Sequence, residues 1–161
     1  MLFGISPELP ANLLQTLSLM GHADEIVICD ANFPASSVAK STHVGEVIQT
    51  GYKTTSRACS DILSLMPLDA FVESPARCME VPGSHDRSPD VHQEVSTVLN
   101  SLPGNPWSLT PLDRFEFYDR ARHTFCVIRT LERRAYGCFL FTKGVLTPDG
   151  ELMTPEFANK V

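Results

Sequence analysis

The chain has 161 residues, of which 43% are hydrophobic and 20% are charged, and its formal net charge at neutral pH is −6. This length favours one domain with a real core and is too short for two comfortable ones. The mild negative charge argues against nucleic acid as a partner, because no basic stripe is available to neutralise phosphates. The composition therefore predicts a single globular domain.

Hydropathy and cysteine content narrow the class of protein further. The first residues lack the positive flank and the long apolar core of a signal peptide, and no later run approaches the roughly 18 apolar residues of a membrane span. The five cysteines form no Cys-x-x-Cys pair, and their odd number fits neither a disulfide framework nor a zinc site. We expect a cytoplasmic protein without a membrane partner, whose cysteines are mostly buried small hydrophobes.

The first predicted helix runs from Ser6 to Gly21. Ser6 is the expected N-cap, Pro7 occupies the first helical position, and Gly21 is a natural stop. One apolar face at helical spacing is formed by Leu9, Leu13, Leu17 and Met20. This helix leads directly into the stretch around which the chain is organised.

An almost continuous apolar run from Glu25 to Asp30 predicts a strand that is buried on both faces. Asp30 lies at the carboxyl end of this strand, where ligands collect in open α/β sheets. His22 lies in the loop before the strand, which at roughly 3.3 Å per residue holds it about 20 Å from Asp30. One copy of the segment therefore need not form a whole site, because the fold or a neighbouring subunit can bring His22 of one copy beside Asp30 of another.

The middle of the chain predicts a loop, two helices and two short strands. Residues 36–55 are polar and indicate mostly loop, and a helix follows over about 55–66. Short strands are expected at 70–73 and 77–81. A cap, proline and acid pattern then begins the most regular helical pattern of the chain, over 88–102.

The next part of the chain predicts a helix followed by two strands. Asp113 and Glu116 have the spacing of a capping box, which starts a helix that continues to about residue 122. Residues 125–128 and 136–141 then indicate two strands joined by a charged turn, which favours an antiparallel hairpin.

The order of these elements favours an α/β fold. We expect a single three-layer domain, in which a mixed sheet is covered by helices on both faces. Residues 1–145 are assigned to this domain. Residues 146–161 show no clear period and are assigned to a peripheral C-terminal tail.

Four pieces of the sequence carry a more specific signal. They are Ser-Pro-Glu-Leu at 6–9, Met-Gly-His-Ala-Asp-Glu-Ile at 20–26, Asp-Ala-Asn-Phe-Pro-Ala-Ser-Ser at 30–37, and the block at 114–121 that leads to Ala-Tyr-Gly at 135–137 and Lys-Gly-Val at 143–145. Their order and approximate spacing resemble the ribose pyranase and fucose mutarotase family, and specifically its fucose mutarotase branch. The resemblance extends over residues 6 to 145 and implies a ribose pyranase-like fold.

The resemblance also implies an activity and an assembly. It implies an isomerase that interconverts the anomers of a monosaccharide such as L-fucose with neither a cofactor nor a metal. It implies a homo-oligomer, a ring-like decamer or smaller, with pockets at the subunit contacts. Carried over position by position, it makes His22 the catalytic acid and places in the substrate-binding set Asp30, Arg114, Tyr136, Gly137 and Cys138.

Two positions depart from the family pattern. The family's Tyr-Gly-Asn is Tyr-Gly-Cys here, so that Cys138 offers a weakly hydrogen-bonding thiol in place of an amide. Residues 49–51 also differ from the Arg-Ala-Asp-Gly run usual among fucose-branch relatives. Both departures bear on the identity of the sugar more than on the reaction.

The residue types suit anomer exchange. Opening a hemiacetal removes a proton from the anomeric hydroxyl and delivers one to the ring oxygen, and both transfers reverse on closure. Histidine, with an ordinary pKa near ~6.5, can do both near neutral pH, and positioned acid–base catalysis contributes roughly 10²–10⁴-fold. Asp30 can accept bonds from sugar hydroxyls, and Arg114 and Tyr136 can donate them. Rings that can stack on a sugar face are Phe33, Phe115 and Phe117.

Each residue also has a purely structural reading. His22 can be a polar helix cap, Asp30 an Asx turn, and Tyr118 a packing residue. No role is assigned to the remaining histidines, which are His43, His85, His92 and His123. At the level of function, the alternatives are a pyranase acting on ribose or another sugar and a non-catalytic sugar-binding homologue.

Overall fold

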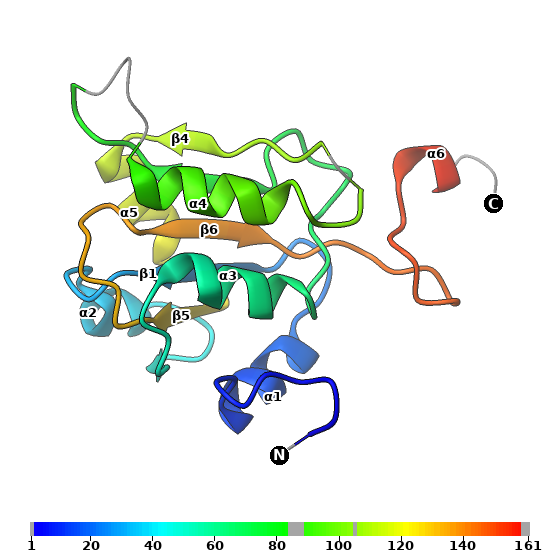
Figure 1. The fold of residues 1–161 in the computed structure, drawn as a ribbon, viewed down its shortest axis with the longest axis horizontal. Coiled ribbons are helices and arrows are strands. Elements are labelled where there is room, and N and C mark those ends of the chain that lie inside the picture. The colour runs from blue at the N-terminus through cyan, green and yellow to red at the C-terminus, as the bar shows by residue number, and fades with distance from the viewer. Residues whose placement is uncertain (1, 84–88, 105, 159–161) are drawn as a thin grey trace.

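Figure 1 shows a mixed sheet with helices on both faces, in a computed structural model that describes residues 2–83, 89–104 and 106–158. The six strands lie in the order β2 (Val47–Gln49), β5 (Cys126–Arg129), β1 (Glu25–Cys29), β6 (Phe139–Thr142), β3 (Ala76–Met79) and β4 (Thr110–Leu112). Within this sheet, β1 is parallel to β5 and antiparallel to β6. The predicted mixed sheet is therefore confirmed, with β1 inside it.

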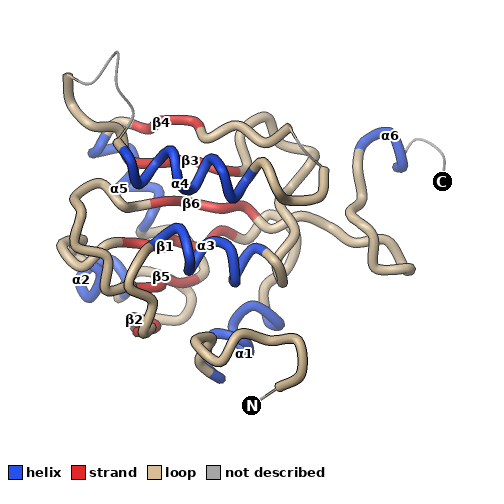
Figure 2. The backbone as a smooth tube through the Cα atoms, in the orientation of Figure 1, coloured by secondary structure: helices blue, strands red, loops and turns tan. Residues whose placement is uncertain are grey.

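The helices form the two outer layers. One face of the sheet is covered by α1 (Ala11–Leu19), α3 (Thr55–Leu63) and α4 (Asp90–Leu99), and the other by α2 (Ala35–Ala39) and α5 (Arg114–Ala121). Figure 2 shows α3 and α4 in front of the strands and α2 and α5 behind them. The three-layer α/β architecture is thus as predicted.

Strand β1 explains why its sequence is an unbroken apolar run. Ile26 and Ile28 pack into the core under α1, α3 and α4, whereas Val27 and Cys29 pack into the core under α2 and α5. All four side chains are fully buried. Because successive side chains of a strand point to opposite faces, a strand covered on both faces needs apolar residues at every position.

The first helix begins later than the sequence pattern predicts. Residues 6–9 form a turn, and α1 starts at Ala11 with Pro10 as its N-cap. Proline disfavours the α conformation in the residue before it, so Leu9 cannot continue a helix into Pro10. Ser6 still accepts a bond from a backbone N–H, that of Glu8, as it would in a cap.

The predicted hairpin of the last two strands is wrong. Strands β5 and β6 both exist, but β1 lies between them and pairs with each. The charged segment between them is therefore a long connection that passes over the end of β1. It is not a tight turn.

Other differences concern short elements. The polar segment 36–55 includes most of α2 and the strand β2, and residues 70–73 form turns where a strand was predicted. Strand β4 was not predicted because it contains Pro111, which lacks a backbone N–H. Its place at the sheet edge makes the proline tolerable.

The remaining helices agree with their predicted starts. The side chain of Asp113 accepts bonds from the backbone N–H groups of Phe115 and Glu116, as a cap of α5 should. Helix α4 begins at Asp90, and the proposed cap Ser88 lies outside the described residues.

The described part of the chain ends in a tail that contains α6 (Pro155–Ala158). Leu146 and Leu152 form an antiparallel bridge within this tail. None of the helices that the structure describes has the length and apolar character needed to cross a membrane.

Candidate functional site

A pocket of about 190 Å³ lies at the carboxyl end of β1, and we call it the Asp30 pocket. Its wall is formed by Asp30, Asn32, Phe33, Met79, Arg114, Tyr118, Ala135, Tyr136 and Cys138. The structure thus brings together Asp30, Arg114, Tyr136 and Cys138 of the predicted site, from segments as far apart as residues 30 and 138. The fifth member, Gly137, contacts this wall through its backbone N–H.

Asp30 is the residue on which the wall is assembled. Its buried carboxylate accepts bonds from the backbone N–H groups of Asn32 at 2.8 Å and Phe33 at 3.1 Å, both through Oδ1. Its Oδ2 accepts bonds from the N–H of Gly137 at 3.0 Å and from the thiol of Cys138 at 3.4 Å. Asp30 therefore forms the Asx turn of the alternative reading and also binds the loop that precedes β6.

The backbone of that loop adopts an unusual conformation at Tyr136. Its φ of +64° lies in the left-handed region, which is unfavourable for a residue with a Cβ atom. This conformation turns the Gly137 N–H toward Asp30. A Cβ atom at residue 137 would lie 3.2 Å from both Glu132 Cγ and Thr55 Oγ1, so the close packing here favours glycine.

Helix α5 contributes two polar side chains to the pocket. Arg114 is its first residue, and the guanidinium carbon lies 4.9 Å from the ring centroid of the exposed Phe115. Tyr118 follows one turn later and stacks on Phe33 with 5.5 Å between ring centroids. Burial raises the pKa of Tyr118, which keeps its hydroxyl protonated. Tyr118 was predicted to be a packing residue, although its spacing of four from Arg114 could have placed it on the same face.

Of the three rings that were predicted to stack on a sugar, one lines the pocket. Phe33 lines the pocket, whereas Phe117 is fully buried in the core and Phe115 is exposed beside Arg114. Phe33 and Met79 give the otherwise polar wall an apolar part.

The thiol of Cys138 is a neutral donor. Burial and the neighbouring carboxylate of Asp30 raise the pKa of Cys138 well above its usual value. The sulfur therefore carries its hydrogen at neutral pH and donates it to Asp30, and it is not activated as a nucleophile.

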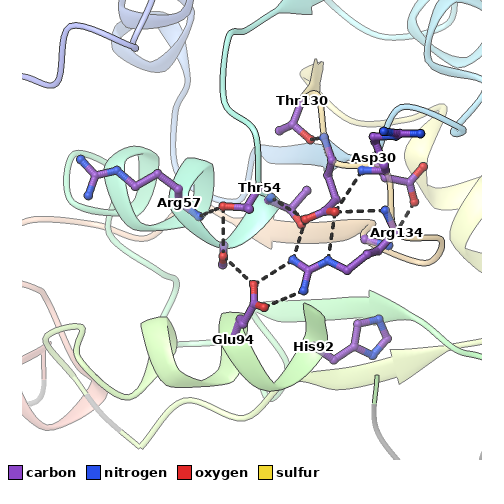
Figure 3. Close-up of polar contacts among 12 residues, drawn as sticks. Asp30, Thr54, Arg57, His92, Glu94, Thr130 and Arg134 are labelled. Atoms are coloured by element: carbon purple, nitrogen blue, oxygen red, sulfur yellow. Dashed lines mark hydrogen bonds and ion pairs between the residues drawn. The ribbon is translucent and has the colours of Figure 1, made fainter. Parts of the chain in front are cut away.

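A second buried carboxylate, that of Glu132, shapes the loop before Tyr136. Its Oε1 accepts bonds at 3.0 Å from the backbone N–H groups of Arg133 and Arg134, and its Oε2 accepts one from the N–H of Thr55 at the start of α3. The Arg134 guanidinium binds Glu132 and also Glu94 of α4, which Figure 3 shows as a network of dashed contacts. The sequence predicted only a charged turn here, because these partners lie far apart in the chain.

The protonation of this network follows from its contacts. Burial opposes the charge on Glu132, but hydrogen bonds from the Arg134 side chain and from backbone N–H groups outweigh it and lower the pKa of Glu132. Hydrogen bonds from Arg134 likewise lower the pKa of Glu94, and both carboxylates raise the pKa of Arg134. At neutral pH, Arg134 is therefore a cation held between two anions.

His22 does not lie in the Asp30 pocket. It follows α1 at the opposite end of β1, with 48% of its side chain exposed. Its Nε2 lies 3.0 Å from Oδ2 of Asp69, whose side chain is 1% exposed and whose Oδ1 accepts a bond from the Phe71 N–H. We call this pair the His22–Asp69 dyad. Asp69 was missed by sequence reasoning, because 47 residues separate it from its partner.

The Lys-Gly pair at 143–144 contacts the segments that carry the two members of the dyad. Lys143 donates from Nζ to the carbonyls of Leu17 and Met20 at the end of α1, and its own carbonyl accepts a bond from the Ala23 N–H. A Cβ atom at Gly144 would lie 2.4 Å from the carbonyl oxygen of Leu68, so only glycine lets the segment before Asp69 approach. This arrangement gives a structural reason for the Lys-Gly-Val piece of the sequence.

A larger cavity of about 480 Å³ lies between the ends of α3 and α4 and the tail. Leucine, serine and proline form most of its lining, which also includes the charged Glu151. It holds none of the predicted site residues. Elsewhere in the described ranges, no three His, Cys, Asp or Glu side chains gather into a group that could hold a metal.

Comparison with known proteins assigns this chain to a family. The RbsD / FucU transport protein family matches residues 3–146. The fucose mutarotase of Homo sapiens is 40% identical over 146 residues, covering 89% of this chain and 93% of that protein. The fucose mutarotase from Streptococcus pneumoniae, whose crystal structure contains L-fucose, is 32% identical with a TM-score of 0.80 and covers 91% of this chain and 100% of that chain.

A more distant structure shares the fold alone. Bacillus subtilis RbsD complexed with D-ribose has a TM-score of 0.67 at 20% identity, covering 91% of this chain and 100% of that chain.

The Glu132 network predicts a stability that depends on pH. Glu132→Gln should lower the free energy of unfolding at pH 7 by about 1–3 kcal/mol, because it removes a charge-assisted acceptor for several partly buried donors. Since the pKa of Glu132 lies below its ordinary value of 4.5 in the folded state, the unfolded chain binds more protons as the pH falls through this range. Wild-type stability should therefore be complete above about pH 5.5 and fall below it, with a shallower fall in the variant. Urea unfolding at pH 7 and pH 4 measures both quantities.

The exposed Glu46 supplies a control for that experiment. Glu46→Gln should change stability by less than about 0.5 kcal/mol at either pH. Parallel losses of stability in wild type and Glu132→Gln between the two pH values would contradict the assignment.

Proposed function

We propose, because this chain belongs to the RbsD / FucU transport protein family, that it is an isomerase which interconverts the α and β anomers of L-fucose or a related monosaccharide. The observation that carries the proposal is the Asp30 pocket. This pocket gathers a carboxylate, a guanidinium and two phenol hydroxyls beside an apolar wall, in a chain that is 40% identical to a fucose mutarotase.

The pocket residues suit a monosaccharide that has both hydroxyls and an apolar end. Arg114, Tyr118 and Tyr136 can donate hydrogen bonds to sugar oxygens. Phe33 and Met79 offer the apolar contact that the methyl group of a 6-deoxy sugar such as L-fucose requires. This combination favours L-fucose over ribose, which has no methyl group.

Asp30 can accept a sugar hydroxyl only by giving up a bond it already has. Both oxygens are engaged by backbone donors, and the contact from the Cys138 thiol at 3.4 Å is the weakest of the four. We propose that a sugar hydroxyl replaces this thiol at Oδ2, while Gly137 and Cys138 complete the binding site.

The His22–Asp69 dyad has the parts of an acid–base catalyst. Asp69 is buried and accepts only, so in the neutral ring Nε2 carries the hydrogen and Nδ1 is left to exchange a proton. We propose that Nδ1 of His22 takes the proton of the anomeric hydroxyl and that the imidazolium so formed gives this proton to the ring oxygen as the bond between C1 and the ring oxygen breaks. Ring closure reverses both transfers. Asp69 orients the ring and stabilises its cationic form.

We propose that a second copy of the chain bridges the distance between the two groups. Strand β1 separates His22 from Asp30, and its length alone, at roughly 3.3 Å per residue, exceeds any contact distance. We propose a homo-oligomer, ring-like and as large as a decamer, in which His22 of one subunit reaches the Asp30 pocket of the next. Residues 1–145 would carry this activity in the cytoplasm without a cofactor.

The first experiment measures anomer exchange directly. Saturation-transfer NMR on L-fucose with catalytic amounts of protein should show faster exchange between the α and β signals than buffer alone, and faster exchange than for galactose or ribose. Exchange restricted to ribose would favour the pyranase alternative. Binding of L-fucose without faster exchange would favour a non-catalytic homologue.

The dyad predicts a graded loss of activity. His22→Ala should reduce kcat by roughly 10²–10⁴-fold, because it removes the acid–base group. Asp69→Asn should reduce kcat by at least about tenfold, because an amide cannot stabilise the cationic ring and can hold the neutral ring in the wrong tautomer. Glu73→Gln, an exposed change on the same loop, is the matched control and should behave as wild type. If Asp69→Asn kept the full kcat, the dyad would have no role in the reaction.

A complementation experiment tests the shared site. His22→Ala and Arg114→Ala should each be inactive alone, but subunits mixed at random should regain about a quarter of wild-type activity, the fraction of sites that receive both intact residues. Co-expression of the two variants with different tags allows mixed oligomers to be purified for NMR. Mixed oligomers as inactive as their parents would place both residues in one subunit's site.

A further inference from the structure

A buried histidine that was assigned no role contacts the Asp30 pocket from α4. His92 lies in the first turn of this helix, close to Glu94 of the network in Figure 3. Its Nε2 lies 2.8 Å from the carbonyl oxygen of Tyr136. Its ring packs edge-on against the fully buried Phe139, with 5.5 Å between ring centroids. A core contact thus orients the ring that binds the pocket backbone.

The chemistry of this contact fixes the direction of the hydrogen bond. A carbonyl oxygen can only accept, so Nε2 of His92 carries the hydrogen and donates it. Burial lowers the pKa of His92, although the bond to Tyr136 opposes this effect. The ring is accordingly neutral at pH 7, and Nε2–H is the form that satisfies the contact.

The bond acts on one peptide unit of the pocket wall. The carbonyl of Tyr136 and the N–H of Gly137 belong to the same planar peptide group. His92 binds its oxygen, and Asp30 binds its N–H at 3.0 Å. The peptide is therefore held from both sides, in the orientation that the left-handed Tyr136 requires.

We propose that His92 is a positioning residue of the sugar pocket, which holds the peptide between residues 136 and 137 and thereby sets the positions of Tyr136 and Cys138 for sugar binding. This inference rests on the proposed function. It deepens that function by adding a residue on α4 that controls affinity without touching the sugar.

The surrounding structure separates this role from general stability and from turnover. The Glu132 and Arg134 contacts hold the loop before Tyr136 independently of His92. The His22–Asp69 dyad lies at the opposite end of β1. Loss of the His92 bond should therefore weaken sugar binding while the turnover of bound sugar is retained.

Two amide variants of different length test the proposal. His92→Gln keeps an N–H donor at nearly the reach of Nε2, whereas His92→Asn keeps the same amide but is too short. His92→Asn should raise KM for L-fucose by about five- to tenfold, equivalent to one hydrogen bond, with kcat within about twofold of wild type. His92→Gln should restore KM to within about twofold of wild type.

A matched control is available in the same protein. The ring of His123 also bonds a backbone carbonyl, that of Asp119 at 2.9 Å, but it is exposed and does not line the pocket. His123→Asn should leave both KM and kcat unchanged. If His92→Asn does not fold, His92→Met replaces it, since methionine fills the space of the ring without an N–H donor.

Hydrogen exchange of the Gly137 amide provides a readout that needs no sugar. Its exchange should be about tenfold faster in His92→Asn than in wild type and close to wild type in His92→Gln. This measurement remains valid even if the protein proves not to exchange L-fucose anomers. The proposal is overturned if His92→Asn keeps wild-type Gly137 exchange, or if it lowers kcat while KM stays unchanged.

Discussion

The buried carboxylate of Asp30 is the interaction on which the site depends. A charge in the interior is tolerated only when hydrogen bonds replace its water, and Asp30 obtains four donors from two segments that lie 107 residues apart. Meeting this requirement fixes the turn after β1 and the loop before β6 against each other. The concave wall of the pocket lies between those two segments because both donate hydrogen bonds to Asp30.

The thiol at residue 138 gives this carboxylate a partner that is easily displaced. An amide in its place would donate a stronger bond to Asp30, whereas a sulfhydryl is a weak donor. Cys138 therefore bonds Asp30 weakly and leaves Oδ2 available to a stronger donor. The departure from the family's Tyr-Gly-Asn is in this way compatible with sugar binding, because the backbone N–H of Gly137 supplies the permanent contact.

The parts of the fold that were predictable are those encoded locally. The apolar run of β1, the helical period of α4 and the Asp113 cap of α5 each depend on neighbouring residues, and the structure has all three. The insertion of β1 between β5 and β6 was not predictable, because strand order depends on long-range pairing that no local pattern records. The late start of α1 was predictable in principle, since Pro10 restricts the residue before it.

The residues of the candidate site were likewise predictable only in part. The family resemblance identified His22 and the pocket residues, and the structure gathers the pocket residues while leaving His22 apart. Asp69, Glu132 and His92 were missed because each acts through a partner far along the chain. A buried acid or histidine in a loop or helix gives no signal of its partner until the fold brings the two together.

Strand β1 lies between two loops that each contain a residue with a strained backbone. Ala23 before it and Tyr136 beyond its far end both have left-handed backbones, whereas the strand is buried from Ile26 to Cys29 and paired along both edges. Central strands of this kind are the last parts of a protein to open, and surface loops open first. The separation between the two ends of β1 therefore stays constant. In the proposed oligomer, in which His22 and the Asp30 pocket of one site come from different subunits, the strand would act as a rigid spacer between neighbouring sites.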